Sequence, residues 1–117
     1  KDPSTQVGAV IVSDGKVIST GYNGFPKGMD DRKMNDRAFK IRHVVHAEMN
    51  AIFNARCDLR GTTLYVSHPP CGECAKLIGA AGIAQIIWKH DEKFAARWST
   101  DEAEDVFVEC GVKFERI

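Results

Sequence analysis

Four side chains in two short segments most constrain how this chain can fold. The first segment is His46-Ala47-Glu48 and the second is Pro70-Cys71-Gly72-Glu73-Cys74. An imidazole and two thiolates are ligands that zinc prefers, and a zinc site with three protein ligands keeps its fourth position open for water. We therefore predict that the fold brings His46, Cys71 and Cys74 together around a zinc ion, with Glu48 beside it as an acid/base.

The spacing within each segment limits how the two can meet. Cys71 and Cys74 are three residues apart, which places them on one face of a helix's first turn, and the prolines before them suit a helix start. His46 and Glu48 are two residues apart, so they point to different sides of a regular helix. They can share a site only off the helix end. We therefore expect two helix N-termini to converge on the metal, where their positive dipole ends favour thiolates.

A redox Cys-x-x-Cys pair or a structural zinc site is the main alternative interpretation. A structural site needs a fourth ligand, and the candidates are His43, His68, His90, Cys57 and Cys110. Glu48 favours the catalytic interpretation, because a structural zinc knuckle does not need that carboxylate. Together the two segments match the signature of zinc nucleobase deaminases, in which the glutamate is the general acid/base.

Length and composition are typical of one compact domain. The chain has 117 residues, 44% hydrophobic and 27% charged, and we predict a single domain over residues 1–117. Because the chain opens at Lys1 without a methionine, we expect an upstream piece, such as a first helix, to be missing. The sequence has no candidate membrane span or signal peptide, and its cysteine usage suits a reducing compartment. We therefore expect a cytoplasmic protein without a membrane partner.

Charge is balanced overall but uneven along the chain. The formal net charge is zero, from 16 basic and 16 acidic residues, which argues against a nucleic-acid-binding surface. Basic residues gather in residues 26–42, where they are Lys27, Arg32, Lys33, Arg37, Lys40 and Arg42. Such a segment could steer a phosphate-bearing substrate, although it is more often a solvated surface loop.

The order of predicted elements indicates an α/β fold. The expected strands are 7–13, 16–22, 62–67, 84–88 and 112–117, and the expected helices are 41–56, 71–82 and 101–110. Asp14-Gly15 predicts a hairpin turn, residues 23–40 a long loop, and Thr100 and Gly111 the caps of the last helix. The helix over 41–56 has an apolar stripe of Val45, Met49, Ile52 and Phe53. Strands joined through helices need parallel neighbours, so we predict a mixed sheet with helices on both faces.

Three segments carry a resemblance to a known family: Gly21-Tyr22-Asn23-Gly24-Phe25-Pro26, His46-Ala47-Glu48-Met49-Asn50-Ala51-Ile52 and Pro70-Cys71-Gly72-Glu73-Cys74-Ala75-Lys76. With them, nearly the whole chain resembles the deoxycytidylate (dCMP) deaminases of the zinc cytidine-deaminase superfamily. The two zinc segments are shared across that superfamily, whereas the first segment narrows the substrate to a deoxycytidine nucleotide. The resemblance implies a cytidine deaminase-like, three-layer α/β/α sandwich around a five-stranded mixed sheet whose last two strands are parallel.

The same resemblance implies an activity, partners and substrate contacts. It implies hydrolytic deamination of dCMP to dUMP with release of ammonia, one catalytic Zn²⁺ per chain, and a homo-oligomer, commonly a hexamer, with dCTP and dTTP as effectors. Substrate contacts are implied for Asn23, Ala47, Lys93 and Phe94, the last standing where relatives often carry a tyrosine. The alternatives are a deaminase of dCTP, cytidine or a tRNA adenosine, and a catalytically inactive, zinc-stabilised regulatory protein.

Overall fold

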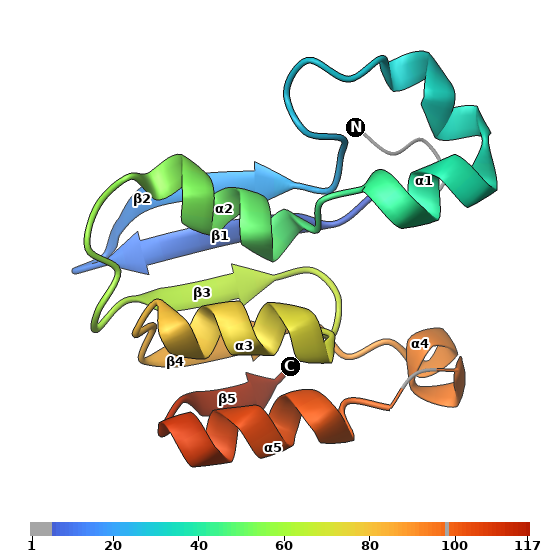
Figure 1. The fold of residues 1–117 in the computed structure, drawn as a ribbon. Helices are drawn as coiled ribbons and strands as arrows, with labels where there is room; N and C mark the ends of the chain where they lie inside the picture. Colours follow the sequence, from blue (N-terminus) through green and yellow to red (C-terminus); the bar gives the residue numbers. More distant parts are fainter. Residues whose placement is uncertain (1–5, 98) are drawn as a thin grey trace.

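The chain folds around one five-stranded mixed sheet with the strand order β2-β1-β3-β4-β5 (Figure 1). The structure is a computed structural model that describes residues 6–97 and 99–117, except for the side chains of Phe94, Ala96 and Arg97. The elements in chain order are β1 (Gly8–Ser13), β2 (Lys16–Tyr22), the 3-10 helix η1 (Asp31–Asn35), α1 (Arg37–His43), α2 (Ala47–Ala55), β3 (Thr63–Val66), α3 (Gly72–Ala80), β4 (Gln85–Trp88), α4 (Glu92–Arg97), α5 (Asp101–Cys110) and β5 (Lys113–Arg116).

The sheet has an antiparallel half and a parallel half. β1 pairs antiparallel with β2 and with β3, whereas β3 with β4 and β4 with β5 are parallel. The hairpin turn is formed by Asp14 and Gly15, whose φ angles of 51° and 76° are those that a tight two-residue turn needs. The later strands are parallel because α3 and α5 return the chain across the sheet before β4 and β5. The predicted mixed sheet, with its last two strands parallel, is confirmed.

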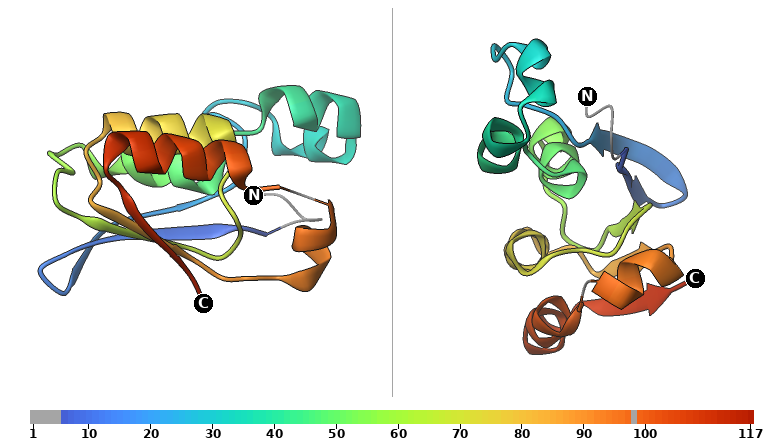
Figure 2. Two further views of the ribbon diagram at one scale, coloured as in Figure 1. Left: turned by 90° about the horizontal axis from the view of Figure 1, so that it is seen from below. Right: turned by 90° about the vertical axis from the view of Figure 1, so that its right-hand side faces the viewer.

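One face of the sheet carries a layer of helices. Figure 2 shows α2, α3 and α5 side by side along this face, and α4 beyond the end of β4, apart from that layer. In β3, Leu64 and Val66 are buried in the core, whereas Tyr65 between them is 43% exposed on the other face. The third layer of the predicted sandwich is not seen within residues 6–97 and 99–117, and it stays a prediction. The largest fully buried core side chains are Trp88, Phe107, Ile11, Leu64, Ile78, Ile83 and Ile86.

The predicted loop over residues 23–40 is wrong in its second half, which forms η1 and the first turn of α1. Asp30 caps η1 and Asp36 caps α1, each because its carboxylate accepts a backbone N–H two or three residues on. Met34 is buried, and Phe25 meets Phe39 edge to face with ring centroids 5.5 Å apart. Local capping and a small apolar cluster therefore order this segment.

The predicted helix over residues 41–56 is two helices, α1 and α2, separated by residues 44–46. Val44 is extended, with φ −70° and ψ 136°. Val45 forms an isolated antiparallel bridge with Gly24, which engages its backbone N–H and C=O outside any helix. This break places His46 at a helix start instead of inside a helix.

Small residues, and not the whole predicted apolar stripe, bring α2 against β2. Phe53 is 63% exposed, so the predicted stripe is wrong to include it as a packed residue. Ala47 and Ala51 are completely buried instead. They face Gly21 of β2, where an added Cβ would lie 2.4 Å from the backbone nitrogen of Ala51 and 2.5 Å from the carbonyl oxygen of Ala47. The helix and the strand therefore meet backbone to backbone.

The remaining predicted elements are confirmed to within about two residues, the usual uncertainty of helix and strand ends. α5 ends at Gly111, whose φ of 74° is the left-handed conformation expected of a helix C-cap. α4 was not predicted; it begins where the carboxylate of Asp91 accepts the N–H of Lys93. In the part of the chain that the structure describes, no helix has the length and apolarity needed to span a bilayer.

Candidate metal centre and active site

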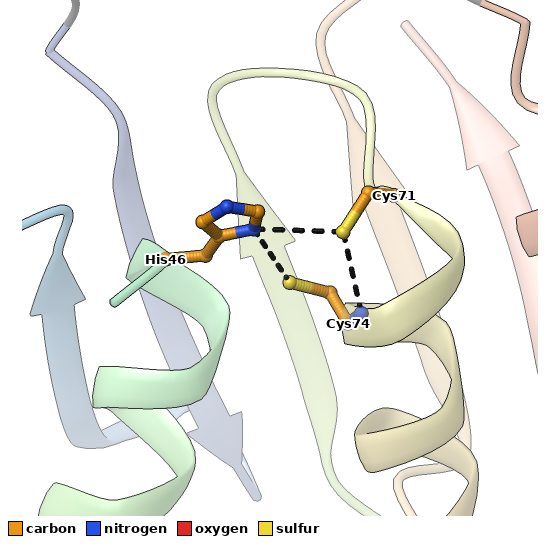
Figure 3. A group of neighbouring side chains, drawn as sticks. All are labelled: His46, Cys71 and Cys74. Atoms are coloured by element: carbon orange, nitrogen blue, oxygen red, sulfur yellow. Dashed lines mark hydrogen bonds between the residues drawn. The ribbon is translucent and has the colours of Figure 1, made fainter. Parts of the chain in front are cut away.

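His46, Cys71 and Cys74 lie together between the starts of α2 and α3 (Figure 3). Their ligand atoms all lie within 4.8 Å of one another. The Nδ1 atom of His46 is 3.2 Å from Sγ of Cys74 and 3.5 Å from Sγ of Cys71. Within residues 6–97 and 99–117, none of the five candidate fourth ligands joins this group. The structure therefore assembles the three predicted ligands and leaves out the residue that a closed structural site would need.

Both helices begin at a residue of this group. His46 is the N-cap of α2 and Cys71 is the N-cap of α3, each with an extended backbone. The backbone N–H of Cys74 donates to Sγ of Cys71 at 3.4 Å. His46 makes no such capping bond, since its ring faces the two cysteines. Two helix N-termini thus converge on the site as predicted, and their positive ends favour anionic sulfur.

The spacing of the three ligand atoms fits a tetrahedral zinc ion. Zn–S bonds of about 2.3 Å and Zn–N bonds of about 2.0 Å at tetrahedral angles place nitrogen and sulfur about 3.5 Å apart. The two nitrogen–sulfur distances here are 3.2 and 3.5 Å. Calcium and magnesium take oxygen ligands, so sulfur and imidazole select against them. Three protein ligands leave one position open, as in catalytic zinc sites.

The two thiols differ in their affinity for protons before a cation binds. The hydrogen bond from Cys74, assisted by His46, lowers the pKa of Cys71 to about 3 against the opposing effect of burial. The hydrogen bond to Cys71 and burial raise the pKa of Cys74. The hydrogen bond with Cys71 also raises the pKa of His46. Zinc needs both thiolates and a neutral imidazole, so metal binding here releases protons and weakens as the pH falls.

Glu48 lies in the first turn of α2 and is only 4% exposed. Burial raises the pKa of its carboxyl, although a hydrogen bond from its own backbone N–H and the charge of His46 oppose this shift. A carboxyl whose pKa is raised toward neutrality takes up and returns a proton more readily than an exposed one. Its position beside the three candidate ligands, outside their group, suits a proton carrier.

The four predicted substrate contacts have different surroundings. Asn23 is 8% exposed, and its Oδ1 accepts the backbone N–H of Val7 at 3.0 Å. Ala47 is completely buried, so its backbone is the part that would hold a base. Lys93 is exposed on α4, and the side chain of Phe94 lies outside the described part of the structure. Their contacts with substrate stay predictions.

A hollow next to α2 is bordered by Tyr22, Gly24, Phe25 and Pro26, but not by Asn23. This hollow has a volume of about 340 Å³, and Asn50 and Asn54 of α2 line its other side. None of the three candidate metal ligands is among its lining residues. Most of the segment that the resemblance associates with the substrate therefore borders a hollow that does not include the candidate metal ligands.

Two of the basic residues in the segment 26–42 have partners within it. Arg32 pairs with Asp30 at 2.7 Å, and the Nζ atom of Lys33 lies 4.8 Å from the centre of the Phe39 ring. Both side chains are exposed. The side chain of Arg32 is 90% exposed and that of its partner Asp30 is 39% exposed. These contacts favour the interpretation of Arg32 and Lys33 as a solvated surface.

Residues 1–90 match the family described as the cytidine and deoxycytidylate deaminase zinc-binding region. The chain belongs to this family. Deoxycytidylate deaminase of Mus musculus is 42% identical to it over an alignment of 125 positions, which covers 99% of this chain and 70% of the mouse protein. An uncharacterized deaminase in the luxG 3′ region of Aliivibrio fischeri is 41% identical, covering 97% of this chain and 80% of that protein.

Solved structures of the family agree with the fold. The dCMP deaminase of cyanophage S-TIM5, solved in complex with dCMP and dUMP, superposes with a TM-score of 0.74 at 27% identity. The match covers 97% of this chain and 82% of the phage chain. The family's zinc-binding region includes His46, Glu48, Cys71 and Cys74, whereas α5 and β5 follow it. The protein is therefore a zinc-binding deaminase domain.

Sequence reasoning missed the residues that hold α2 in place. They are Ser19 and Gly21 in β2, and the bridge between Gly24 and Val45. A sequence signal existed for Gly21, because a glycine inside a strand often marks the close approach of another backbone.

Proposed function

We propose that this protein is a zinc-dependent deaminase that hydrolyses dCMP to dUMP with release of ammonia, supplying dUMP for thymidylate synthesis. The observation that carries the proposal is the buried carboxyl of Glu48 beside a group of three candidate zinc ligands. The mouse relative named deoxycytidylate deaminase and the phage dCMP deaminase solved with dCMP and dUMP support this substrate.

In this proposal the chain's residues have separate tasks. His46, Cys71 and Cys74 hold zinc, which when bound makes hydroxide available from water at neutral pH. Glu48 accepts the proton of the attacking water and delivers it to N3 of the cytosine. The oxygen of that water adds to C4, and Glu48 then takes the second proton from the resulting C4 hydroxyl. It delivers this proton to the amino group, which leaves as ammonia while the C4 carbonyl forms. Burial favours the protonated carboxyl, so Glu48 can hold each proton between accepting it and delivering it.

The burial of Glu48 also separates this proposal from an inactive, zinc-stabilised regulatory protein. Removing a carboxylate from water costs free energy unless its charge is compensated. Its carboxyl lies near His46 and the two cysteines at a helix start; of its neighbours, Ala47 belongs to the core cluster and Met49 packs against it. A carboxyl retained at that cost is expected of a working proton carrier, and a regulatory protein has no need of it.

We expect a 5′-monophosphate to raise kcat/KM over that of deoxycytidine by about a hundredfold or more. One or two charge-assisted hydrogen bonds to a phosphate contribute a few kcal/mol, and about 1.4 kcal/mol corresponds to tenfold. Lys93 is the first candidate cation, because it is exposed on α4 and matches the family's near-substrate segment, whereas Arg32 and Lys33 have partners. Ammonia release from dCMP, deoxycytidine, dCTP and cytidine measures this preference.

Lys93→Ala tests the phosphate contact, with Lys16→Ala as its control. Lys16 is another exposed lysine, but it lies next to the hairpin turn at the start of β2. Equal kcat/KM for dCMP and deoxycytidine would reject the nucleotide substrate. A preference for dCMP that survives Lys93→Ala would assign the phosphate to another cation. Adding dCTP or dTTP to the dCMP assay tests the effector response that we also propose from the family resemblance.

We further propose that the protein assembles as a homo-oligomer, with a hexamer expected from the family resemblance. Several large apolar side chains would face water in a monomer, and a surface rich in them often marks an interface. These exposed side chains are Val17, Ile18, Tyr22, Ile41, Phe53, Tyr65, Val108 and Ile117. Sedimentation velocity at micromolar concentration should show a species several times the 13.0 kDa chain mass. A monomer under these conditions would contradict assembly.

A further inference from the structure

The backbone on both sides of His46 is fixed by β2 and the residues that follow it. Before His46, the N–H of Gly24 donates to the carbonyl of Val45 at 3.0 Å, and the N–H of Val45 donates back at 2.7 Å. After His46, the carbonyl oxygen of Ala47 packs so close to Gly21 that a Cβ added at Gly21 would lie only 2.5 Å from it. His46 therefore lies between Val45, which is paired with Gly24, and Ala47, whose backbone contacts Gly21.

Further hydrogen bonds hold the same part of α2 against β2. The Oγ atom of Ser19, a buried residue, donates to the carbonyl of Ala51 at 2.6 Å. Asn50 Nδ2 donates to the carbonyl of Tyr22 at 2.8 Å, while the backbone N–H of Asn50 donates to the carbonyl of His46 at 3.0 Å. The first turns of α2 are thus held against β2 by close backbone packing and by hydrogen bonds.

This arrangement bears directly on the metal centre, because His46 and the two cysteines come from different helices. The cysteines are placed by the start of α3 and His46 by the start of α2, so the position of α2 relative to α3 affects how closely Nδ1 approaches their sulfurs. A zinc site tolerates errors of only about 0.2 Å in its ligand distances. A displacement of α2 on β2 would reach His46 and Glu48 together.

We propose that Gly21 and the Gly24–Val45 bridge are positioning residues of the metal centre, setting the depth and direction of α2 so that His46 meets Cys71 and Cys74. The inference rests on the proposed function, since it assigns these residues to the zinc site of that reaction. They act through His46 and Glu48 and do not touch the substrate in this role.

Gly21→Ala tests the proposal most directly. Ordinary contact distances begin at 3.4 Å, whereas the added Cβ would lie 2.4 and 2.5 Å from two backbone atoms of α2. The helix must therefore move by about 1 Å, a misplacement that can lower turnover by about a hundredfold. Gly8→Ala is the matched control, because Gly8 pairs with Tyr22 from β1 and a Cβ there would meet no atom within 4 Å.

The measurements separate positioning from stability. For Gly21→Ala we expect a native circular dichroism spectrum, an altered absorption spectrum of the cobalt-substituted site, and at least about tenfold weaker zinc binding by chelator competition. We also expect kcat for dCMP to fall by about a hundredfold with a smaller change in KM. Gly8→Ala should resemble the native protein in all four measurements. A folded Gly21→Ala protein with the native cobalt spectrum, zinc affinity and kcat would overturn the proposal.

A second pair of variants applies if Gly21→Ala fails to fold. Asn50 and Asn54 lie one turn apart on α2 and make the same kind of bond, to the carbonyls of Tyr22 and Thr20. We expect Asn50→Ala to weaken zinc binding several-fold and Asn54→Ala to leave it unchanged, although each loses one hydrogen bond. Asn50 bonds to Tyr22, the neighbour of Gly21, so equal zinc affinities for the two variants would show that the contact of α2 with this part of β2 does not position His46, and would reject the proposal.

These readouts also distinguish the inference from the proposed function. If the native protein releases no ammonia from dCMP while Gly21→Ala still disturbs the cobalt spectrum and zinc affinity, the deaminase proposal fails and the positioning role stands. If the native protein is active and the metal measurements on Gly21→Ala are unchanged, the positioning role fails alone.

Discussion

Replacing Glu48 by Gln should leave zinc in place and lower kcat for dCMP by at least about a hundredfold. The amide keeps the shape of the side chain but cannot carry a proton, and general acid/base catalysis typically contributes about a hundredfold to ten thousandfold. Glu48 is buried in the first turn of α2 beside the candidate ligands, so its carboxyl is well placed to carry the proton. Metal content and single-turnover rates on the same preparation measure the two quantities.

The control for this variant is Glu73→Gln. Glu73 lies in the first turn of α3, the other helix that begins at the site, but its side chain is 74% exposed and paired with Lys76. The same change of chemistry there should leave kcat within about twofold, because exposed ion pairs contribute little. A Glu48→Gln protein with full zinc occupancy and a near-normal rate would show that the proton travels by another route.

Ligand chemistry explains why the centre of the site could be predicted from the sequence. His46, Cys71 and Cys74 are residue types that zinc selects, and the two-residue spacing of His46 and Glu48 allowed only a site off a helix end. The structure places two of them at helix N-caps, which agrees with that geometric argument. Local rules also predicted α5, because Gly111 ends it in a conformation that favours glycine.

The errors in the predicted fold come from interactions that local patterns do not contain. The break between α1 and α2 depends on pairing of Val45 with Gly24, a residue far away in the sequence. The exposure of Phe53 follows from the close approach of α2 to Gly21, which selects small residues for the buried side of the helix. Periodicity alone treats every apolar residue as a candidate for the core.

Substrate contacts are less predictable than metal ligands for a physical reason. A metal selects few residue types at fixed distances, whereas a nucleotide can be held by a backbone, an amide or any nearby cation. Asn23 illustrates this, because its Oδ1 already accepts the N–H of Val7 and so helps to order the chain before β1. The resemblance alone assigned it to the substrate.

Cys71→Ala should abolish zinc binding and turnover together, from about one ion per chain in the native protein. The substitution removes one of three protein ligands and also the acceptor that caps the N–H of Cys74 at the start of α3. Loss of an outer partner of a metal ligand already costs about tenfold to a hundredfold, so loss of a ligand itself should cost more than about a hundredfold in kcat.

The matched control for the metal site is Cys57→Ala. Cys57 is a free, exposed cysteine outside the candidate metal group, so its removal should change neither zinc content nor rate. Metal analysis and ammonia release on both proteins, at equal concentration and after the same dialysis, make the comparison direct. Full zinc occupancy and native turnover in Cys71→Ala would contradict the ligand assignment. Zinc loss in both variants would show that zinc binding does not depend specifically on the site between α2 and α3. Zinc loss in Cys71→Ala alone is the result expected if Cys71 is a ligand at that site.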